Sequence, residues 1–412
     1  MEDKALYSEI LGLQPPWEIV DIRLDMAEER VDIYIEWPYG TEAPCPVCSE
    51  GNDTTLCKIH DRRQERVWRH LDTCQMKTYI HCHIPRIKCP HHGIKTIQID
   101  WADAKVRFTH LFERLAIQML QMSANRSQTA NILRISWDEL NRIMTRAVDR
   151  GLSRRNKEDI LSIGMDEKSF LSGHRYVTIM TDNDGKRVID VAENRDKNAV
   201  DTLWQGLSEK QRNNVQSICI DFWKAYIYGA RCHAPQADIV YDRFHVTKYL
   251  NEAVDKVRKK EHRELRRKKD TSLSRTKYLW LKNPENWTAK DENRYAGLSK
   301  SQLAVGRAWN RKELFREFWS LTTVEEAKAF FKRWYFSATH SRLKPIIEVA
   351  KMLKRHLDGL LTWIKHHVTN GLAEGFNSKI QQIKSIARGF RDFNNYRIAI
   401  LFHLGGLDMI PH

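Results

Sequence analysis

ICIDFWKAY, residues 218–226, places one carboxylate, that of Asp221, directly after a short apolar run. An apolar run of this length is typical of a strand that is buried on both faces, as in a parallel sheet. A carboxylate at this point has two explanations. It caps the helix that begins next, or it lies at a strand end, where α/β sheets gather the side chains that bind ligands.

The residues before this stretch predict the start of an α/β domain. Two strands, RYVTIMTD (175–182) and KRVIDVAE (186–193), are joined by NDG, which is a strong hairpin signal. They follow a short apolar strand that ends in Asp166, and a helical stretch at 196–214 leads on to the strand before Asp221. If the strands that end at Asp166 and Asp221 are neighbours, the two carboxylates meet.

Two carboxylates about 4 Å apart repel by about 4 kcal/mol at an effective dielectric constant near 20. A site that keeps both of them ionised therefore needs a cation. Oxygen ligands on a partly open site suit Mg²⁺ or Mn²⁺. Capping is the better explanation for either Asp166 or Asp221 alone, whereas the pair favours a metal.

A third carboxylate comes from a predicted helix in TNGLAEGFNSKIQQIKSIARGF, which begins at Thr369. Helical spacing gives this stretch an apolar face and a polar face. The polar face is rich in Asn, Ser and Gln, and consists of Glu374, Asn377, Ser378, Gln381, Ser385 and Arg388. A solvated surface is the alternative, but this composition suits contact with a metal site or a DNA backbone.

Six of the eight cysteines lie between Cys45 and Cys89, which suggests a metal site rather than disulfides. Cys45 and Cys48 form a C-x-x-C pair, and Cys89 and His92 form a C-x-x-H pair. Two such knuckles can hold one tetrahedral structural Zn²⁺. Reduced buried cysteines are one alternative, and a ligand set that uses Cys57 and His60, which also have C-x-x-H spacing, is another.

A helix-turn-helix is predicted after this zinc-binding segment. Ser127 can cap a short helix that ends at Leu133, and Ser136 with Glu139 forms a capping box for the next helix. The second helix would present Asn and Arg side chains to DNA. The candidate DNA contacts of this region are Arg134, Asn141, Arg142 and Arg146. An ordinary helical bundle would show the same pattern.

The charge of the chain favours a polyanionic partner. It has 68 Lys and Arg against 53 Asp and Glu, a net charge of +15. Nine of the fourteen residues at 256–269 are Lys or Arg and are predicted to lie on one exposed helix. The DNA-backbone candidates here are Lys259, Lys260, Arg266 and Arg267, and Arg388 is a further candidate. Most of the tryptophans that follow are expected to form a helical core, and stacking of one on an unpaired base is the alternative.

The N-terminal sequence shows no signal peptide, and no segment has the roughly 18 consecutive apolar residues of a membrane span. The sequence thus predicts a cytoplasmic protein without a membrane partner.

The blocks GMDEKSF, ICIDFWKAY, YDRFHV and NGLAEGFNSKI together resemble the signature blocks of DDE transposases of bacterial insertion sequences, closest to the ISL3 group. The CPVC and CPHH knuckles and the helix-turn-helix resemble the N-terminal parts of that group, in the same order. The resemblance covers about residues 40 to 405. One departure is His92, since the second knuckle of the family often ends in Cys.

The resemblance implies a ribonuclease-H-like catalytic domain whose catalytic, Mg²⁺-binding residues are Asp166, Asp221 and Glu374. It implies two Mg²⁺ or Mn²⁺ ions per active site, which cleave DNA and transfer strands. His245 matches the His of the DRFH block, and it and Asn377 would support the site. The implied partner is double-stranded DNA, as terminal inverted repeats and target, bound by a homodimer in the bacterial nucleoid.

The expected fold is therefore multidomain α/β. A zinc-ribbon-like module and a helix-turn-helix precede a ribonuclease-H-like domain that carries an all-α insertion. The expected boundaries are 1–40 for an N-terminal segment, 41–100 for zinc, 105–150 for the helix-turn-helix, 158–254 with 365–405 for catalysis, and 255–364 for the insertion. The alternative function is a catalytically inactive, transposase-derived DNA-binding regulator. The intact carboxylate triad argues against it.

Overall fold

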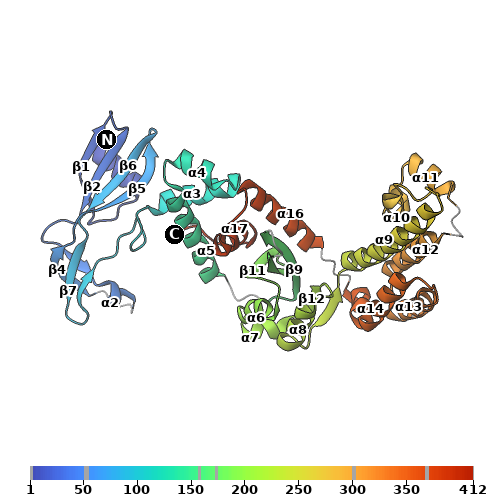
Figure 1. Ribbon diagram of the computed structural model, residues 1–412. Helices are drawn as coiled ribbons and strands as arrows, with labels where there is room; N and C mark the ends of the chain where they lie inside the picture. The colour runs from blue at the N-terminus through green and yellow to red at the C-terminus, as the bar shows by residue number, and fades with distance from the viewer. Residues whose placement is uncertain are drawn as a thin grey trace. The chain divides into compact units, whose positions relative to one another are not determined.

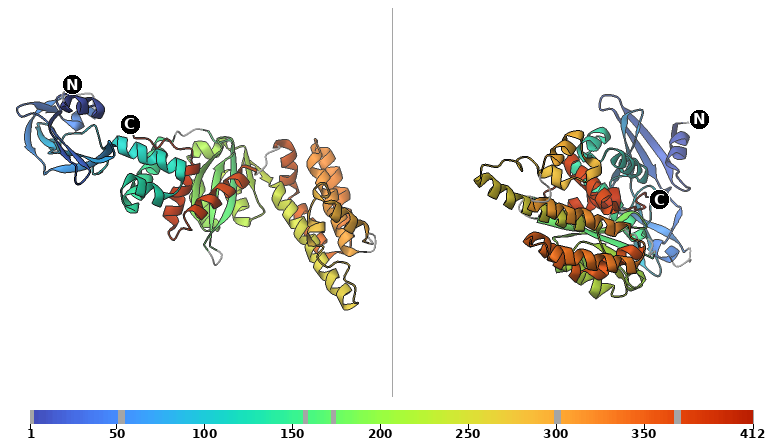
Figure 2. Two further views of the ribbon diagram at one scale, coloured as in Figure 1. Left: turned by 90° about the horizontal axis from the view of Figure 1, so that it is seen from above. Right: turned by 90° about the vertical axis from the view of Figure 1, so that its right-hand side faces the viewer.

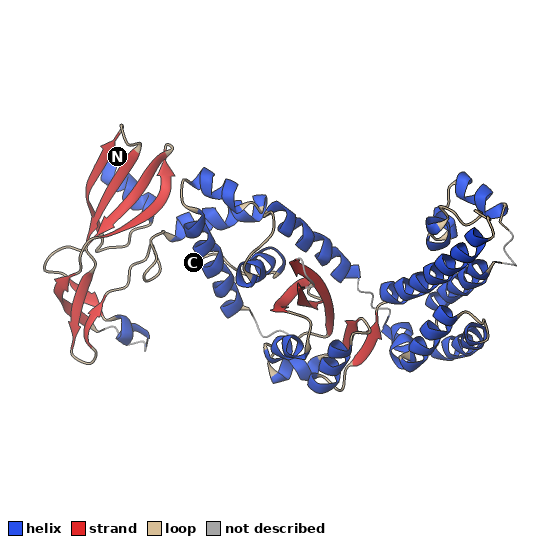
Figure 3. Ribbon diagram, viewed as in Figure 1, coloured by secondary structure: helices blue, strands red, loops and turns tan. Residues whose placement is uncertain are grey.

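The structure is a computed structural model that describes residues 3–50, 55–155, 159–171, 175–298, 303–366 and 371–411, without the side chains of residues 3 and 371–374. The chain divides into two compact units, residues 1–155 with 407–412, and residues 156–406. Each unit contains both helices and strands (Figures 1 and 3). In the described ranges, no helix is long and apolar enough to cross a membrane.

The first unit begins with two small sheets and ends with three helices. Its elements are α1 (Asp3–Leu11), β1 (Glu18–Asp25), β2 (Arg30–Glu36), β3 (Glu42–Pro44), α2 (Pro46–Glu50), β4 (Leu56–Arg62), β5 (Arg66–Thr73), β6 (Met76–Cys82), β7 (Pro85–Cys89), β8 (Gly93–Thr96), α3 (His110–Ser123), α4 (Arg126–Leu133) and α5 (Trp137–Arg154).

The first sheet has the strand order β1-β2-β6-β5. Residues 18–36, expected only as an N-terminal segment, thus pair with strands from the zinc-binding stretch. The reason is the alternation in β2, where Val31, Ile33 and Ile35 are buried and need a partner. The second sheet, β3-β4-β7-β8, carries the two cysteine knuckles.

The helix-turn-helix region folds as α3, α4 and α5. The predicted capping box is confirmed, since Ser136 accepts from the backbone of Glu139 and Glu139 accepts from that of Ser136. The predicted cap at Ser127 is wrong. Asn125 caps α4 instead, because its side chain accepts from Gln128 N at 3.1 Å and places the first turn two residues earlier.

The second unit contains a five-stranded sheet and a set of helices. Its elements up to the helical region are β9 (Ser162–Leu171), β10 (Arg175–Asp182), β11 (Arg187–Glu193), α6 (Lys197–Gln205), α7 (Glu209–Asn214), β12 (Ser217–Ile220), α8 (Lys224–His233) and β13 (Asp238–Tyr241). The sheet order is β11-β10-β9-β12-β13. Antiparallel pairing joins the first three strands, and parallel pairing joins β9, β12 and β13.

All described elements from Arg243 to His366 are helical, as Figure 3 shows. They are α9 (Arg243–Arg267), α10 (Lys277–Leu281), η1 (Pro284–Asn286), α11 (Ala289–Ala296), α12 (Ala304–Arg316), η2 (Glu317–Ser320), α13 (Val324–Thr339), α14 (Lys344–Arg355) and α15 (Leu357–His366). Helix α9 packs along α12 and α14 (Figure 2). The chain then returns to the sheet with α16 (Gly371–Ile386) and α17 (Phe393–Leu404).

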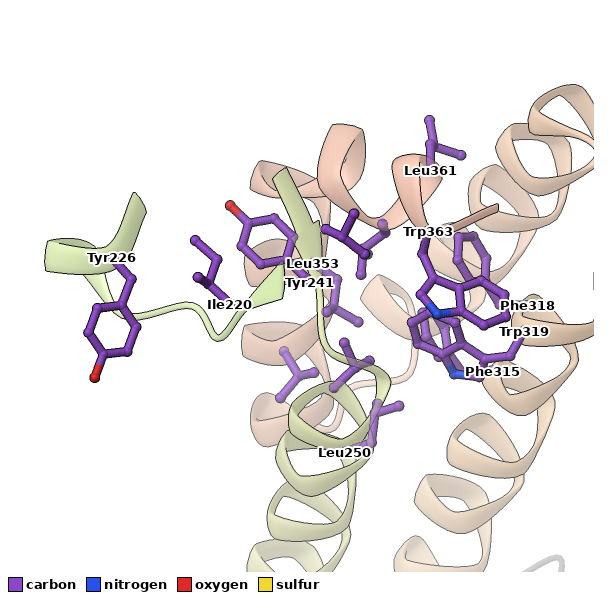
Figure 4. Close-up of a cluster of buried hydrophobic side chains, with 14 of the residues drawn as sticks. Ile220, Tyr226, Tyr241, Leu250, Phe315, Phe318, Trp319, Leu353, Leu361 and Trp363 are labelled. Carbon is purple, nitrogen blue, oxygen red and sulfur yellow. The ribbon is translucent and has the colours of Figure 1, made fainter. Parts of the chain in front are cut away.

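The helical region and the sheet share one hydrophobic core. Figure 4 shows Tyr241 of β13 and Leu250 of α9 in the same cluster as Leu353, Trp363 and Trp319 from the later helices. The tryptophans of this region lie in the core as expected. Five are buried (Trp280, Trp309, Trp319, Trp334 and Trp363), and Trp287 stacks on Trp309 with ring centroids 5.6 Å apart.

Candidate functional site

Strand β9, which contains Asp166, and strand β12, which ends just before Asp221, are parallel neighbours, and this is the condition under which the sequence brings the two carboxylates together. The register pairs Cys219 of β12 with Gly164 of β9. Continued by two residues, one past the end of β12 at Ile220, this register brings Asp221 level with Asp166. Residues in register on parallel strands point to the same face of a sheet, and both carboxylates are half-buried.

The apolar run predicts that the strand ends at Asp166. Strand β9 instead continues to Leu171. The antiparallel neighbour β10 explains this, because it pairs with β9 along its length, with Ile179 opposite Asp166. The parallel neighbour β12 ends at Ile220. Asp166 therefore lies where the pairing of β9 with β12 has ended and its pairing with β10 continues.

Helix α16 contacts Asp166 directly. Asn377 Nδ2 donates to Asp166 Oδ2 at 2.6 Å, and the backbone N of Glu167 donates to Asp166 Oδ1 at 2.8 Å. Glu374 belongs to the same helix, three residues before Asn377, but its side chain lies outside the described residues. The helix ends at Ile386, earlier than the pattern predicts, because Arg388 and Gly389 have positive φ (54° and 95°).

Asp221 is not the cap of the helix that follows it. Helix α8 begins at Lys224 with Trp223 at its N-cap position. Asp221 Oδ1 accepts from Trp223 N at 2.8 Å and so stabilises the turn between β12 and α8. The capping explanation is thus wrong for Asp221.

Burial raises the pKa of both Asp166 and Asp221 above the usual range of an aspartate. Hydrogen bonds from the backbone and from Asn377, together with the charge of His245, oppose the effect of burial on the pKa of Asp166. The negative charges of Glu167 and Asp166 raise the pKa of Asp221 further. The arrangement therefore favours a bound cation over two bare carboxylates.

A third aspartate, Asp242, lies beside Asp221 and forms a row of aspartates with Asp166 and Asp221. It was not predicted from the sequence. Asp242 directly follows β13, and the register pairs the preceding Tyr241 with Ile220 of β12. Asp242 is therefore level with Asp221. Its Oδ1 accepts from Phe244 N at 3.0 Å as the cap of α9, and its Oδ2 lies 3.9 Å from His245 Nε2. The available signal was that Asp242 follows an apolar run, DIVY, as Asp221 follows SICI.

The predicted zinc ligands come together in the first unit. The ligand atoms of Cys45, Cys48, Cys89 and His92 all lie within 4.8 Å of one another. The Cys48 and Cys89 sulfurs are 3.8 Å apart, and the Cys45 sulfur lies 3.8 Å from His92 Nδ1. Tetrahedral bonds of about 2.1–2.3 Å give ligand separations of about 3.4–3.8 Å, so the residues fit Zn²⁺.

The alternative ligand pair lies outside this cluster. Cys57 donates to Thr55 O at 3.7 Å, and the exposed ring of His60 lies 4.0 Å from Asp61.

The predicted DNA contacts of the helix-turn-helix differ in how they are held. Arg142 is exposed on α5 and donates to Asp138 O at 3.3 Å, and Asn141 accepts from Arg126 at 2.7 Å. Arg134 instead pairs with Asp72, and Arg146 pairs with the buried Glu113.

The remaining predicted DNA contacts lie in the second unit. Lys260, Arg266 and Arg267 are exposed within the last eight residues of α9, whereas Lys259 pairs with Asp255 at 2.8 Å. Arg388 is exposed in the turn after α16.

Three family models match the chain in order. They are a zinc-finger of transposase IS204/IS1001/IS1096/IS1165 at residues 41–92, a helix-turn-helix domain of transposase family ISL3 at 97–148, and a DDE transposase domain of the ISL3 type at 163–400.

Among curated proteins, the transposase for insertion sequence element IS1557 of Mycobacterium tuberculosis is 27% identical over 352 residues, which is 79% of this chain and 78% of that protein. The transposase for insertion sequence element IS1001 of Bordetella parapertussis is 25% identical over 339 residues, 81% of this chain and 83% of that protein. With a DDE domain model that matches more than half of its residues, together with the row of aspartates and the Cys₃His cluster, the chain belongs to the ISL3 family of transposases.

Proposed function

We propose that this protein binds the terminal inverted repeats of an insertion sequence and catalyses metal-dependent DNA strand cleavage and strand transfer. The observation that carries the proposal is the register of β9 and β12, which brings Asp166 level with Asp221. The DDE domain model and the transposases that resemble this chain support it.

We infer that the sheet of the second unit is ribonuclease-H-like and that residues 255–364 are an all-α insertion within it. Three antiparallel strands followed by two parallel ones, in the order β11-β10-β9-β12-β13, support the first inference. The helices between β13 and α16 support the second.

Asp166, Asp221 and Glu374 are the proposed ligands of two Mg²⁺ or Mn²⁺ ions. The fit rests on the donor set, since half-buried carboxylates in register suit a hard divalent cation. When bound, such ions activate a water molecule and stabilise the leaving 3′ oxygen.

The side chains of this chain would prepare the site for in-line displacement. Asn377 fixes one oxygen of Asp166, which leaves that carboxylate a single orientation. His245, 3.9 Å from Asp242 at the start of α9, would offset part of the negative charge of the neighbouring carboxylates. Water attacks the phosphorus, the bond to the 3′ oxygen breaks, and that oxygen takes up a proton as a 3′-hydroxyl. The 3′-hydroxyl would then attack a phosphodiester of target DNA, whose own bond from phosphorus to the 3′ oxygen breaks.

One Zn²⁺, held by Cys45, Cys48, Cys89 and His92, is proposed to stabilise the first unit. The cluster has four ligands, which is typical of a closed structural site.

Double-stranded DNA is the proposed partner, and a homodimer would hold two element ends. Arg142 and Asn141 on α5 are the proposed base-reading contacts, and Lys260, Arg266, Arg267 and Arg388 the proposed phosphate contacts. Arg134, Arg146 and Lys259 would have to exchange internal ion pairs for phosphates. Work on DNA would place the protein in the bacterial cytoplasm, at the nucleoid.

The test is a cleavage and strand-transfer assay on terminal-repeat DNA with Mg²⁺. Asp221→Asn should lower both rates by at least about a thousandfold, because it removes a charged ligand, and should leave DNA binding unchanged. Asp184→Asn, in the exposed turn between β10 and β11, is the matched control. Normal cleavage and transfer by Asp221→Asn would show that the catalytic assignment is wrong.

A further inference from the structure

A groove of about 450 Å³ runs along α9, and its lining residues repeat at helical spacing on one face of the helix. They begin at Phe244, continue through Lys248 and Lys256 and end at Lys259, with Lys277 and Leu281 of α10 on the other side. The groove lies within the second unit, and neither the proposed DNA contacts of α5 nor the zinc cluster belongs to it.

One end of the groove adjoins the carboxylates. Phe244 is two residues after Asp242, which is level with Asp221, and its ring lies 5.6 Å from that of His245. The Phe244 side chain is 54% exposed. A single exposed aromatic needs no explanation, but an aromatic ring at this end of a basic groove is suited to stack on a base.

The charges along the groove suit a polyanion. Lys248, Lys256 and Lys277 are exposed, and in the described ranges neither Lys248 nor Lys256 makes an ion pair. The negative charge of Asp255 is balanced by Arg258 and Lys259, each at 2.8 Å. Glu252 is the other acidic residue in the lining.

The length of the groove also suits a strand of nucleic acid. Fifteen helical steps separate Phe244 from Lys259, which corresponds to about 22 Å along the axis at about 1.5 Å per residue. A DNA strand with a rise of about 3.4 Å per nucleotide covers this distance with about six nucleotides.

We infer that the groove along α9 binds a single, unpaired DNA strand beside the scissile phosphate, with a base stacked on Phe244 and phosphates on Lys248 and Lys256. The inference rests on the proposed function, because it concerns the strand that the carboxylates would cut. On this inference, the start of the helical region would hold the DNA end in an unpaired state.

Binding of a fluorescent twelve-nucleotide oligothymidylate to the full chain tests the inference, without Mg²⁺ and with an excess of unlabelled duplex. Phe244→Ala and Phe244→Leu should each lower the affinity about tenfold, since stacking on one base contributes about 1–3 kcal/mol. Phe244→Trp, which keeps an aromatic ring, should bind within about twofold of the parent. Phe336→Ala, which removes an exposed aromatic residue of α13, is the control and should bind normally.

The lysines have their own readout. The double variant Lys248→Ala, Lys256→Ala should reduce the slope of log affinity against log salt by about 1.4, because each single-strand phosphate contributes about 0.7. Parent-like affinity of Phe244→Ala, an unchanged slope for the double variant, or displacement of the oligothymidylate by duplex would overturn the inference. Melting curves of each variant identify any that fails to fold, and if Phe244→Ala does, Phe244→Leu carries the test.

The two proposals can fail separately. If the parent cleaves element ends and Phe244→Ala binds the oligothymidylate normally, the proposed function stands and the inference about the groove is wrong. If the parent binds the oligothymidylate through Phe244 but cleaves no DNA, the groove binds a strand as inferred and the proposed function is wrong.

Discussion

Asn377 holds one oxygen of Asp166 in place, and a single hydrogen bond of this kind has a measurable effect. The 2.6 Å bond comes from a helix 211 residues further along the chain. Residues that orient a ligand typically contribute 10- to 100-fold to metal affinity or activity. Asn377 therefore differs from the exposed Gln381, one turn further along α16.

Asn377→Ala should slow cleavage about 10- to 100-fold and raise the Mg²⁺ concentration needed for half-maximal rate. A titration of cleavage rate with Mg²⁺ measures both quantities. Gln381→Ala is the control and should match the parent in both. An equal loss of rate at all Mg²⁺ concentrations would mean that Asn377 acts on something other than the metal ligand.

His70 makes the first unit sensitive to acid. Burial, with a smaller contribution from the charge of Arg69, lowers the pKa of His70 to about 4. An unfolded histidine has a pKa near 6.5, so between these values the unfolded chain binds a proton that the folded chain does not. The contribution of neutral His70 to the free energy of unfolding is therefore fully present above pH 6.5 and is lost as the pH falls towards 4.

The free energy of unfolding should fall by about 2 kcal/mol through His70 alone between pH 7 and pH 5. In the parent, His70 Nδ1 lies 2.9 Å from Thr109 Oγ1. His70→Asn keeps a polar side chain beside Thr109, and its free energy of unfolding should fall by about 2 kcal/mol less than that of the parent over the same pH range. Denaturant unfolding at both pH values measures the difference. The comparison of the two proteins cancels the effect of acid on the zinc ligands, and equal pH dependence would contradict the prediction.

At the scale of elements, α3 and α5 are joined by a buried charge. Glu113, 1% exposed, pairs with Arg146 and with Arg150, the latter at 3.1 Å. Removal of one partner from a buried ion pair costs up to about 3–5 kcal/mol, because the remaining charges stay unbalanced. Both arginines keep some contact with water, which places the cost at the lower end.

Glu113→Gln should therefore lower the free energy of unfolding of the first unit by about 3 kcal/mol, as measured by denaturant titration. Arg142→Gln, on the exposed side of α5, is the contrasting variant. It should leave stability unchanged, weaken DNA binding and reduce the salt slope by about 1. If both variants lost only stability, α5 would be a structural helix rather than a DNA reader.

The elements that the sequence predicts are those specified by local signals. The hairpin at NDG, the capping box of α5 and the strand before Asp221 all follow from neighbouring residues. The pairing of β2 with β6 does not, because it joins residues about 47 positions apart in a sheet that no local pattern encodes. The extension of β9 past Asp166 was missed for the same reason, since its partner β10 decides where it ends.

At the site, the sequence predicts Asp166 and Asp221 because each carboxylate interrupts an apolar run. It does not identify Asp242, whose weaker pattern needs the register of β13 to place it beside Asp221. It also cannot distinguish Arg142 from Arg146, which lie four residues apart on one helix. The difference between them comes from Glu113 on another helix.

At the scale of the whole molecule, the boundary between the proposed catalytic part and the proposed insertion is not a break in the chain. Helix α9 starts beside the carboxylates at Arg243 and continues without interruption to Arg267. Its buried residues Leu250 and Val254 join the core that Figure 4 shows, together with residues of the later helices. A single helix therefore links the row of aspartates to the helical region, which makes the position of one depend on the other.

The two units should respond separately to loss of zinc, because each has its own core. Cys45→Ser should reduce bound Zn²⁺ from one per chain to none and abolish the folding transition of the first unit, since metal binding there supplies folding free energy. The transition of the second unit should stay at the same temperature. Calorimetry with metal analysis measures both, and Cys74→Ser, at an exposed turn, is the control. A folded, metal-free first unit in Cys45→Ser would show that the four ligands are ordinary buried residues.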